Sequence, residues 1–342
     1  MAHNIGQMFY FGERPWHRLG EELKAPATLE QALAAGGLDW EVTLLPIVPA
    51  GEPESRIGHR VAVVRTDKKP GEAGRVVGVV HPGFEPLQNR QGARMFDALM
   101  GKGKAIYHTG GYLKNGEVIW LLARLPGDIR VRSDDILETY LLFTNSHDGS
   151  VAIDIRLTTV RVVCQNTLSL ALHQHDTAGK VFRRAHHGRY ALLQEDARTF
   201  FDFSMRHSRE TGNLFARMAN KPCTDKEFQD FLEQLMPDPG KPASADRNAA
   251  VQHAYETRME TTRANRKQIM GVHREGIPKH NILPAEGDWW GALNTITAWS
   301  DHLQTTENER YAHLLLGSGD KLKASAFARI QATTGINYAD AR

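Results

Sequence analysis

The sequence predicts an α+β fold: an antiparallel β-meander of two or more hairpins followed by helices, with a mainly helical C-terminal part. Two observations lead to this prediction. Apolar runs of strand length flank Asn115-Gly116 and Asp148-Gly149, and such dipeptides favour the tight turns of β-hairpins. After Tyr190 the apolar residues recur every three or four positions, which is the spacing of an amphipathic helix.

The chain has 342 residues, of which 41% are hydrophobic, so it is long enough to bury a large core. We expect an α+β core with an antiparallel sheet over residues 1–180 and a mainly helical region over residues 181–342. A Pro-rich linker is expected near residues 236–246. One domain with a helical annex is the alternative organisation.

A short helix is expected to begin after Thr28, which forms a capping-box pattern with Gln31, and to end at Gly36-Gly37. Three strand-like runs follow, separated by loops rich in Gly, Pro and charge. The runs are WEVTLLPIV from Trp40, RVAVVRT from Arg60 and RVVGVV from Arg75.

A second helix is expected from Asn89 to Gly101, with Asn89 as its N-cap. Gln88 and Asn89 could instead bind a base or a backbone. The first hairpin comes next, with a primed turn at Asn115-Gly116, which needs positive φ at both central residues. Its second arm, from Val118 to Leu125, is apolar at odd and even positions and therefore predicts an interior strand covered on both faces.

The outgoing strand of the second hairpin alternates apolar residues with Asp154 and Arg156, but the alternation slips after Thr159. One extra residue at Thr158-Thr159, a β-bulge, would return Arg161 to the face of Arg156. We therefore expect this strand to present two arginines to solvent or to a ligand.

A short helix capped by Asn166 or Thr167 is expected to lead into the most basic run of the chain. This run is KVFRRAHHGR, from Lys180 to Arg189, and contains no acidic residue. A charge run is usually a solvated surface. Because this one follows the arginine-bearing strand closely, phosphate binding is an equally good interpretation.

The C-terminal half predicts four further helices: Tyr190 to about Met218, Thr224 to Leu235, Ala249 to about Met270, and Trp289 to Leu303 with Asp288 as its cap. The helix from Ala249 is polar, so it is either a solvent-bridging helix or a second basic surface. The helix from Trp289 carries an apolar stripe typical of a core or a subunit contact.

The composition excludes several classes of protein. A net charge of +2 provides no global field for nucleic acid or membrane binding, so any basic surface must be local. The chain contains two widely separated cysteines, Cys164 and Cys223, which is typical of a reduced compartment. The N-terminus lacks a signal-peptide pattern, and no apolar run reaches membrane-span length. We therefore expect a cytoplasmic protein.

Several segments together resemble a family found in phages, plasmids and their hosts, a domain of unknown function of the DUF932 type. Arg18 departs from the family's pattern, and so does the pair Asp288-Trp289. The matching segments are Pro15-Trp16-His17 with Leu19-Gly20, Glu85-Pro86 with Gln88-Asn89, Asn145 to Gly149, Val163 to Leu168, Trp290-Gly291 to Asp301-His302, and Gly317-Ser318-Gly319 with Leu322-Lys323. The resemblance implies a mobile genetic element, in which recombination, replication and counter-defence are common functions. The predicted meander also resembles the single-strand annealing recombinases in fold, which implies rings with DNA along a basic groove.

The first functional hypothesis is a nucleic-acid-binding protein of a mobile genetic element that binds or anneals single-stranded DNA in recombination. Tyr107, Tyr112 and Phe182 are its candidate stacking residues. We expect no cofactor, no metal, no membrane partner and a homo-oligomer, with a ring as one form. The candidate phosphate contacts are Lys102, Lys104, Arg156, Arg161, Lys180, Arg183, Arg184 and Arg189.

Two alternatives remain open. The first is a metal-dependent nuclease or nucleotide hydrolase, although Asp148 is explained by its turn and Asp154 by pairing with Arg156. Its ligands would come from His147, Asp148, Asp154, His173 and His175. The second is a counter-defence or host-interaction protein whose Trp-bearing helix binds a host protein. The sequence favours a binding protein over an enzyme without deciding between them.

Overall fold

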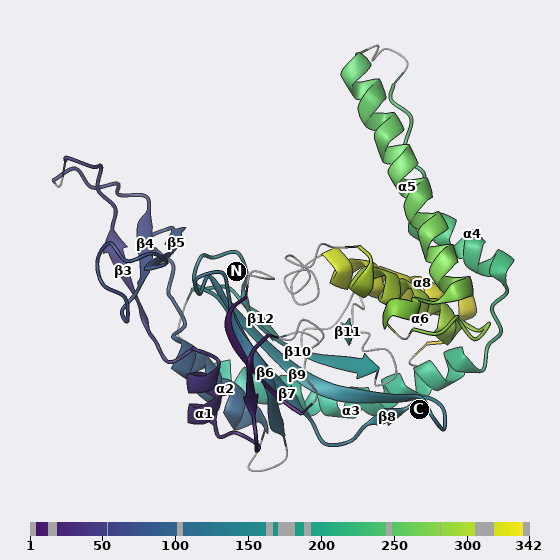
Figure 1. The fold of residues 1–342 in the computed structure, drawn as a ribbon, viewed down its shortest axis with the longest axis horizontal. Coiled ribbons are helices and arrows are strands. Elements are labelled where there is room, and N and C mark those ends of the chain that lie inside the picture. Colours follow the sequence, from purple (N-terminus) through teal and green to yellow (C-terminus); the bar gives the residue numbers. More distant parts are fainter. Residues whose placement is uncertain are drawn as a thin grey trace.

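The computed structural model describes residues 5–12, 19–52, 54–100, 105–161, 167–169, 182–187, 193–243, 248–280, 282–304 and 318–337. Antiparallel sheets form the N-terminal part and helices form most of the C-terminal part (Figure 1). This architecture confirms the predicted α+β class. The predicted division near residue 180 stays a prediction, since one buried cluster includes residues from Phe9 to Ile336.

The larger sheet has the strand order β11-β10-β9-β7-β6-β1-β2, with β12 paired to β10 and β8 paired to β9, and most of its strand pairs are antiparallel. The pair β1–β2 is parallel. The strands are β1 Ile5–Phe11, β2 Glu21–Leu23, β6 Ile106–Leu113, β7 Val118–Arg124, β8 Ile129–Arg130, β9 Ile136–Ser146, β10 Ile153–Arg161, β11 Thr167–Ser169 and β12 Phe182–Arg184.

Both predicted hairpins are present, as β6–β7 and β9–β10. The second turn differs from the prediction, because positive φ occurs at Gly149 (78°) but not at Asp148. The first turn differs as well, because positive φ occurs at Lys114 (54°) and Gly116 (117°) but not at Asn115. The loop spans four residues, and the carboxylate of Glu117 accepts a hydrogen bond from the Asn115 amide at 2.6 Å. This side-chain bond stabilises a loop wider than the two-residue primed turn.

Strand β7 lies between β6 and β9 and is covered on both faces, as predicted. Ile119 and Leu121 on one face belong to the main core. Val118 and Trp120 on the other face belong to a smaller buried cluster that also includes Met8.

The register of β10 corrects the predicted bulge. Pairing with β9 runs without a shift from Asp154 opposite Thr144 to Arg161 opposite Leu137. Arg156 and Arg161 are therefore on opposite faces of a regular strand. The apolar alternation breaks for a different reason. Both faces of β10 are buried from Ile153 to Thr159, so the strand has no solvent-facing side that would require a polar residue at every second position.

The segments after β10 also differ from the prediction. The expected helix after Asn166 is wrong, because Thr167–Ser169 form β11 against Thr158–Val160. Part of the basic run forms a strand, since Phe182–Arg184 form β12 against Ile153–Ile155. These short strands provide hydrogen-bond partners for the edge of β10 that β9 leaves open.

The three strand runs after residue 40 form a separate antiparallel sheet, β3 Val42–Pro46, β4 Val61–Arg65 and β5 Val76–Val80, which projects from the larger sheet (Figure 1). Helix α1, Leu29–Ala35, has the predicted capping box and ends at Gly36. Helix α2, Asn89–Met100, follows the small sheet.

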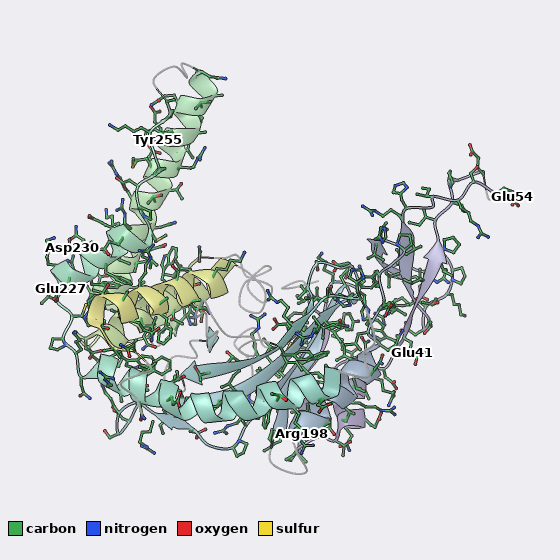
Figure 2. All side chains as sticks on the ribbon, turned by 180° about the vertical axis from the view of Figure 1, so that it is seen from behind. Glu41, Glu54, Arg198, Glu227, Asp230 and Tyr255 are labelled. Carbon is green, nitrogen blue, oxygen red and sulfur yellow. The ribbon has the colours of Figure 1, made fainter. Side chains whose placement is uncertain are left out.

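The helical part confirms the predicted helices. Helix α3, Leu193–Ala219, runs along one face of the larger sheet (Figures 1 and 2). Helix α6, Trp289–His302, is buried on nearly all sides and contacts α3, α5 and α8, so its apolar stripe belongs to the core. The remaining helices are α4 Asp225–Leu235, α5 Ala249–Glu275, the 3-10 helix η3 Pro278–His280, and α8 Ser318–Thr334. Among the helices of the described residues, none combines the length and apolarity needed to cross a membrane.

Gly78 provides a test of how the small sheet is joined to the β9–β10 hairpin. A Cβ at Gly78 would lie 2.5 Å from the backbone oxygen of His147 and 2.6 Å from Cα of Asp148. We expect Gly78→Ala to lower the free energy of unfolding by about 1–3 kcal/mol, because neither backbone can move aside cheaply. Urea denaturation measures this change. Gly58→Ala is the matched control, since a Cβ there has nothing within 4 Å, and equal effects of both substitutions would contradict the contact.

Candidate functional site

The candidate site lies at the edge of the larger sheet, where β12 pairs with the start of β10. Phe182 anchors this strand and is 2% exposed. The next two side chains, those of Arg183 and Arg184, are exposed. The strand thus holds two adjacent arginines at a fixed place on the sheet edge.

A buried carboxylate organises these arginines. Asp154 is fully buried and accepts hydrogen bonds from Nε of Arg156 at 2.6 Å and from Nε of Arg183 at 3.1 Å. An unpaired buried carboxylate would be strongly destabilising, so Asp154 requires these cations. The predicted pairing of Asp154 with Arg156 is confirmed.

The two arginines that bind Asp154 have different environments. The side chain of Arg156 is 8% exposed, so this residue is a structural counter-ion and not one of two solvent-facing arginines. The side chain of Arg183 is 61% exposed. Since its Nε atom is bound to Asp154, its terminal nitrogens are held at the surface in a defined orientation.

The other predicted phosphate contacts are only partly brought together. The guanidinium of Arg184 lies 5.2 Å from the ring of Phe182 and donates a hydrogen bond to the Arg183 oxygen. Arg161 is at the far end of β10, and its side chain lies outside the described residues. Lys102, Lys104, Lys180 and Arg189 also lie outside them. Strand β6, which follows the two lysines, is separated from β12 by β7, β9 and β10.

The predicted metal ligands do not meet within the described part of the chain. His147 Nε2 lies 2.8 Å from Asn89 Oδ1, and Asp148 Oδ1 accepts from the amide and hydroxyl of Ser150. Asp154 is bound to arginines. The described residues contain no group of three His, Cys, Asp or Glu side chains able to hold a metal ion. His173 and His175 lie outside the described ranges.

Several residues that carry the family resemblance form a buried junction between segments of the fold. Asn89 is the first residue of α2 and not its cap, because its Nδ2 donates to the backbone oxygens of Leu38 and Trp40. The side chain of Gln88 accepts a hydrogen bond from the backbone N–H of Val42 and donates one to the backbone oxygen of the same residue. Asn145 Nδ2 donates to the oxygen of Leu87 at 3.1 Å. The side-chain amides of Gln88 and Asn89 therefore bind backbone groups, which was the alternative to helix capping in the sequence analysis.

Arg65 completes this junction and is not singled out by any sequence motif. It is 5% exposed, and its guanidinium lies 4.1 Å from the ring of Trp40. It also donates to Asp67 and to the backbone oxygen of Asn115. The available sequence signal was an arginine that ends an otherwise apolar strand.

His147 is neutral in this junction. Burial, with smaller contributions from His186 and Arg65, lowers the pKa of His147 from its usual 6.5 to about 3. Asn89 uses its Nδ2 group as a donor, so Oδ1 accepts the proton of His147 Nε2. Nδ1 of the ring is buried and has no hydrogen-bond partner among the described residues. Protonation there would bury an uncompensated charge.

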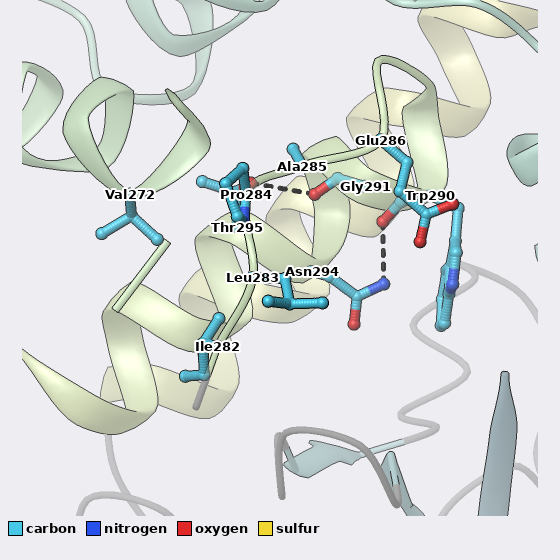
Figure 3. Close-up of a pocket in the computed structure, with 10 residues that line it drawn as sticks. All are labelled: Val272, Ile282, Leu283, Pro284, Ala285, Glu286, Trp290, Gly291, Asn294 and Thr295. Atoms are coloured by element: carbon cyan, nitrogen blue, oxygen red, sulfur yellow. Dashed lines mark hydrogen bonds between the residues drawn. The ribbon is translucent and has the colours of Figure 1, made fainter. Parts of the chain in front are cut away.

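A cavity between the end of α5, the segment 282–286 and α6 is too small for a nucleotide (Figure 3). Its volume is about 30 Å³, which is room for one or two water molecules. Asn294 and Thr295 line it, but their side chains donate to backbone oxygens of their own helix.

A buried ion pair joins the last two helices of the described chain. Lys323 Nζ lies 2.8 Å from Asp301 Oδ1, and each side chain is 1% exposed. Trp290 Nε1 donates to Asp135 Oδ2 and so connects α6 to the segment before β9. These residues of the resembling segments also stabilise the fold.

The neutral state of His147 predicts acid sensitivity. The pKa of His147 is lower in the folded chain than in the unfolded chain. The contribution of this residue to the free energy of unfolding is therefore fully present above pH 6.5 and is lost as the pH falls toward 3. This residue alone should remove about 2 kcal/mol between pH 7 and pH 5. Urea denaturation at both pH values measures the loss, and His147→Gln should reduce it. Burial also lowers the pKa of His186 and His273, so His147→Gln should retain part of the loss. An unchanged pH dependence in His147→Gln would contradict the assignment.

The Asp301–Lys323 pair predicts a non-additive mutant cycle. Lys323→Met should lower the free energy of unfolding by about 3–5 kcal/mol, because it removes an ammonium group that is bound to the buried Asp301 carboxylate. The double variant Asp301→Leu with Lys323→Met should be more stable than Lys323→Met alone. Thermal and urea denaturation of both single variants and of the double variant test this. Additive losses would show that the two charges do not interact.

The comparisons with known proteins gave one match. The family described as Domain of unknown function (DUF932) matches residues 76–323, which include β5 to β12 and α2 to α6. A search of the curated proteins found no match, and neither did a search of the solved structures. Because the matched range covers more than half of the chain, the protein belongs to the DUF932 family, whose function is unknown.

Proposed function

We propose that this protein binds nucleic acid, and single-stranded DNA in particular, along the sheet edge formed by β12. The observation that supports this most is Arg183, which is tied to the buried Asp154 through Nε and is 61% exposed. An oriented guanidinium with outward terminal nitrogens suits a phosphate oxygen, since less side-chain freedom is lost on binding.

The surroundings of Arg183 support the same ligand. Arg184 lies next to it, and Lys180 and Arg189 belong to the same acid-free run. The stacking residues expected from the sequence are less available: Phe182 is 2% exposed, Tyr107 is 3% exposed, and Tyr112 is half-buried. We therefore propose binding through phosphates, which depends strongly on salt and little on base sequence.

The setting of this activity follows from the family resemblance. In a mobile genetic element, a surface that holds single strands would serve strand binding or annealing during recombination. The host-interaction alternative has less support, because α6, the helix with the tryptophans, is buried almost completely. The hydrolase alternative lacks an assembled ligand set among the described residues.

Fluorescence anisotropy with a labelled single-stranded oligonucleotide at low salt tests the proposal. Arg184→Ala keeps the Asp154 pairs intact and should weaken binding several-fold. It should also reduce the slope of log Kd against log salt by about 1. Adding Arg183→Ala should weaken binding further, with thermal melting used to confirm that the double variant is folded.

Arg198→Ala is the matched control, because this exposed arginine belongs to α3 and lies outside both β12 and the acid-free run of residues 180–189 (Figure 2). It should bind as tightly as the unmodified protein. Equal affinities of all variants would contradict the site, and no binding by the unmodified protein would contradict the function. Competition with unlabelled duplex measures the preference for single strands.

A further inference from the structure

Helix α5 extends away from the rest of the molecule and has a free face. It contains 27 residues, Ala249–Glu275, and its first buried side chain is Ile269. Figures 1 and 2 show the helix projecting from the body, with Tyr255 on the projecting part. A polar helix of this kind needs a second element along it to remain ordered.

One side of α5 already has such an element. Arg266 forms an ion pair with Asp238 in the Pro-rich segment that precedes the helix. Tyr255, Met259 and Thr262 are half-buried and lie at helical spacing with Arg266. The half-buried stripe on this side therefore has a partner within the chain.

A second face carries four exposed charges that are segregated by sign. Glu256, Glu260, Arg263 and Lys267 are all exposed, and at about 100° per residue they fall within about 60° of one another on the helix. Within the described chain, no residue forms an ion pair with Glu260, Arg263 or Lys267.

This segregation is unfavourable in the isolated helix. Glu256 and Glu260 are four residues apart, as are Arg263 and Lys267, so each pair places like charges next to each other. The helix dipole does not account for the arrangement, since its effect is confined to the first and last turns and these four residues lie further inside.

We propose that this face binds the same face of a second copy of the chain in an antiparallel helix pair. A two-fold axis between positions 261 and 262 would place Glu256 opposite the partner subunit's Lys267. The same axis would place Glu260 opposite the partner subunit's Arg263. All four like-charge neighbours on each helix would then gain an opposite charge across the interface.

The pairing is self-complementary and closes after two copies. Such an isologous interface produces a dimer and not an open chain of subunits. The contact uses none of the residues proposed to bind nucleic acid.

Sedimentation velocity of the full chain over a concentration series tests the proposal. The unmodified protein should form a dimer that high salt weakens. Glu256→Lys with Glu260→Lys should be monomeric, and Arg263→Glu with Lys267→Glu should be monomeric as well. An equimolar mixture of these two variants should form a heterodimer, because one arm is then wholly basic and the other wholly acidic.

Arg258→Glu is the control, since this exposed residue lies on α5 but outside the charged face. It should dimerise like the unmodified protein, and circular dichroism should show unchanged helix content in every variant. A monomer at all concentrations would overturn the proposal. A dimer that persists in both charge-reversed variants would also overturn it.

Discussion

The buried carboxylate of Asp154 sets the arrangement of the sheet edge and of the proposed site together. A fully buried charge must be compensated, and Asp154 obtains one cation from its own strand and one from β12. This requirement keeps β12 in register with the start of β10. The same bond that stabilises the sheet also orients Arg183, so the fold and the proposed binding surface share one interaction.

A second constraint explains the positions of three polar residues that carry the family resemblance. Asn89 and Asn145 use their amides to satisfy backbone groups of the segments that join the two sheets, and His147 is buried as a neutral ring beside them. Buried loop segments need such partners because they have no regular hydrogen-bonding pattern of their own. Shared polar residues of this kind define a junction of the fold and do not by themselves indicate catalysis.

Much of the fold followed from local sequence signals, whereas the edge of the large sheet did not. The Thr28 capping box and the Asp288 cap involve residues three positions apart, so the sequence displays them directly. β11 and β12 pair with β10 across longer segments of chain, and pairing of this kind leaves no periodic pattern. The burial of Arg156 was hidden for the same reason, since the second cation on Asp154 comes from a different strand. Of the predicted phosphate contacts, Arg183 and Arg184 are adjacent and exposed. Sequence proximity alone could not show that Arg156 would be buried as a counter-ion of Asp154.

Local charge organisation matters more here than total charge. A net charge of +2 cannot attract a polyanion over long distances, so the proposed binding would depend on arginines whose positions are fixed before the ligand arrives. α5 shows a different case, in which one face carries two negative and two positive charges that are segregated by sign. Salt would weaken both contacts, because each is exposed. The residues differ, however: β12 offers only positive charge and therefore suits phosphate, whereas the face of α5 offers both signs and therefore suits a copy of itself.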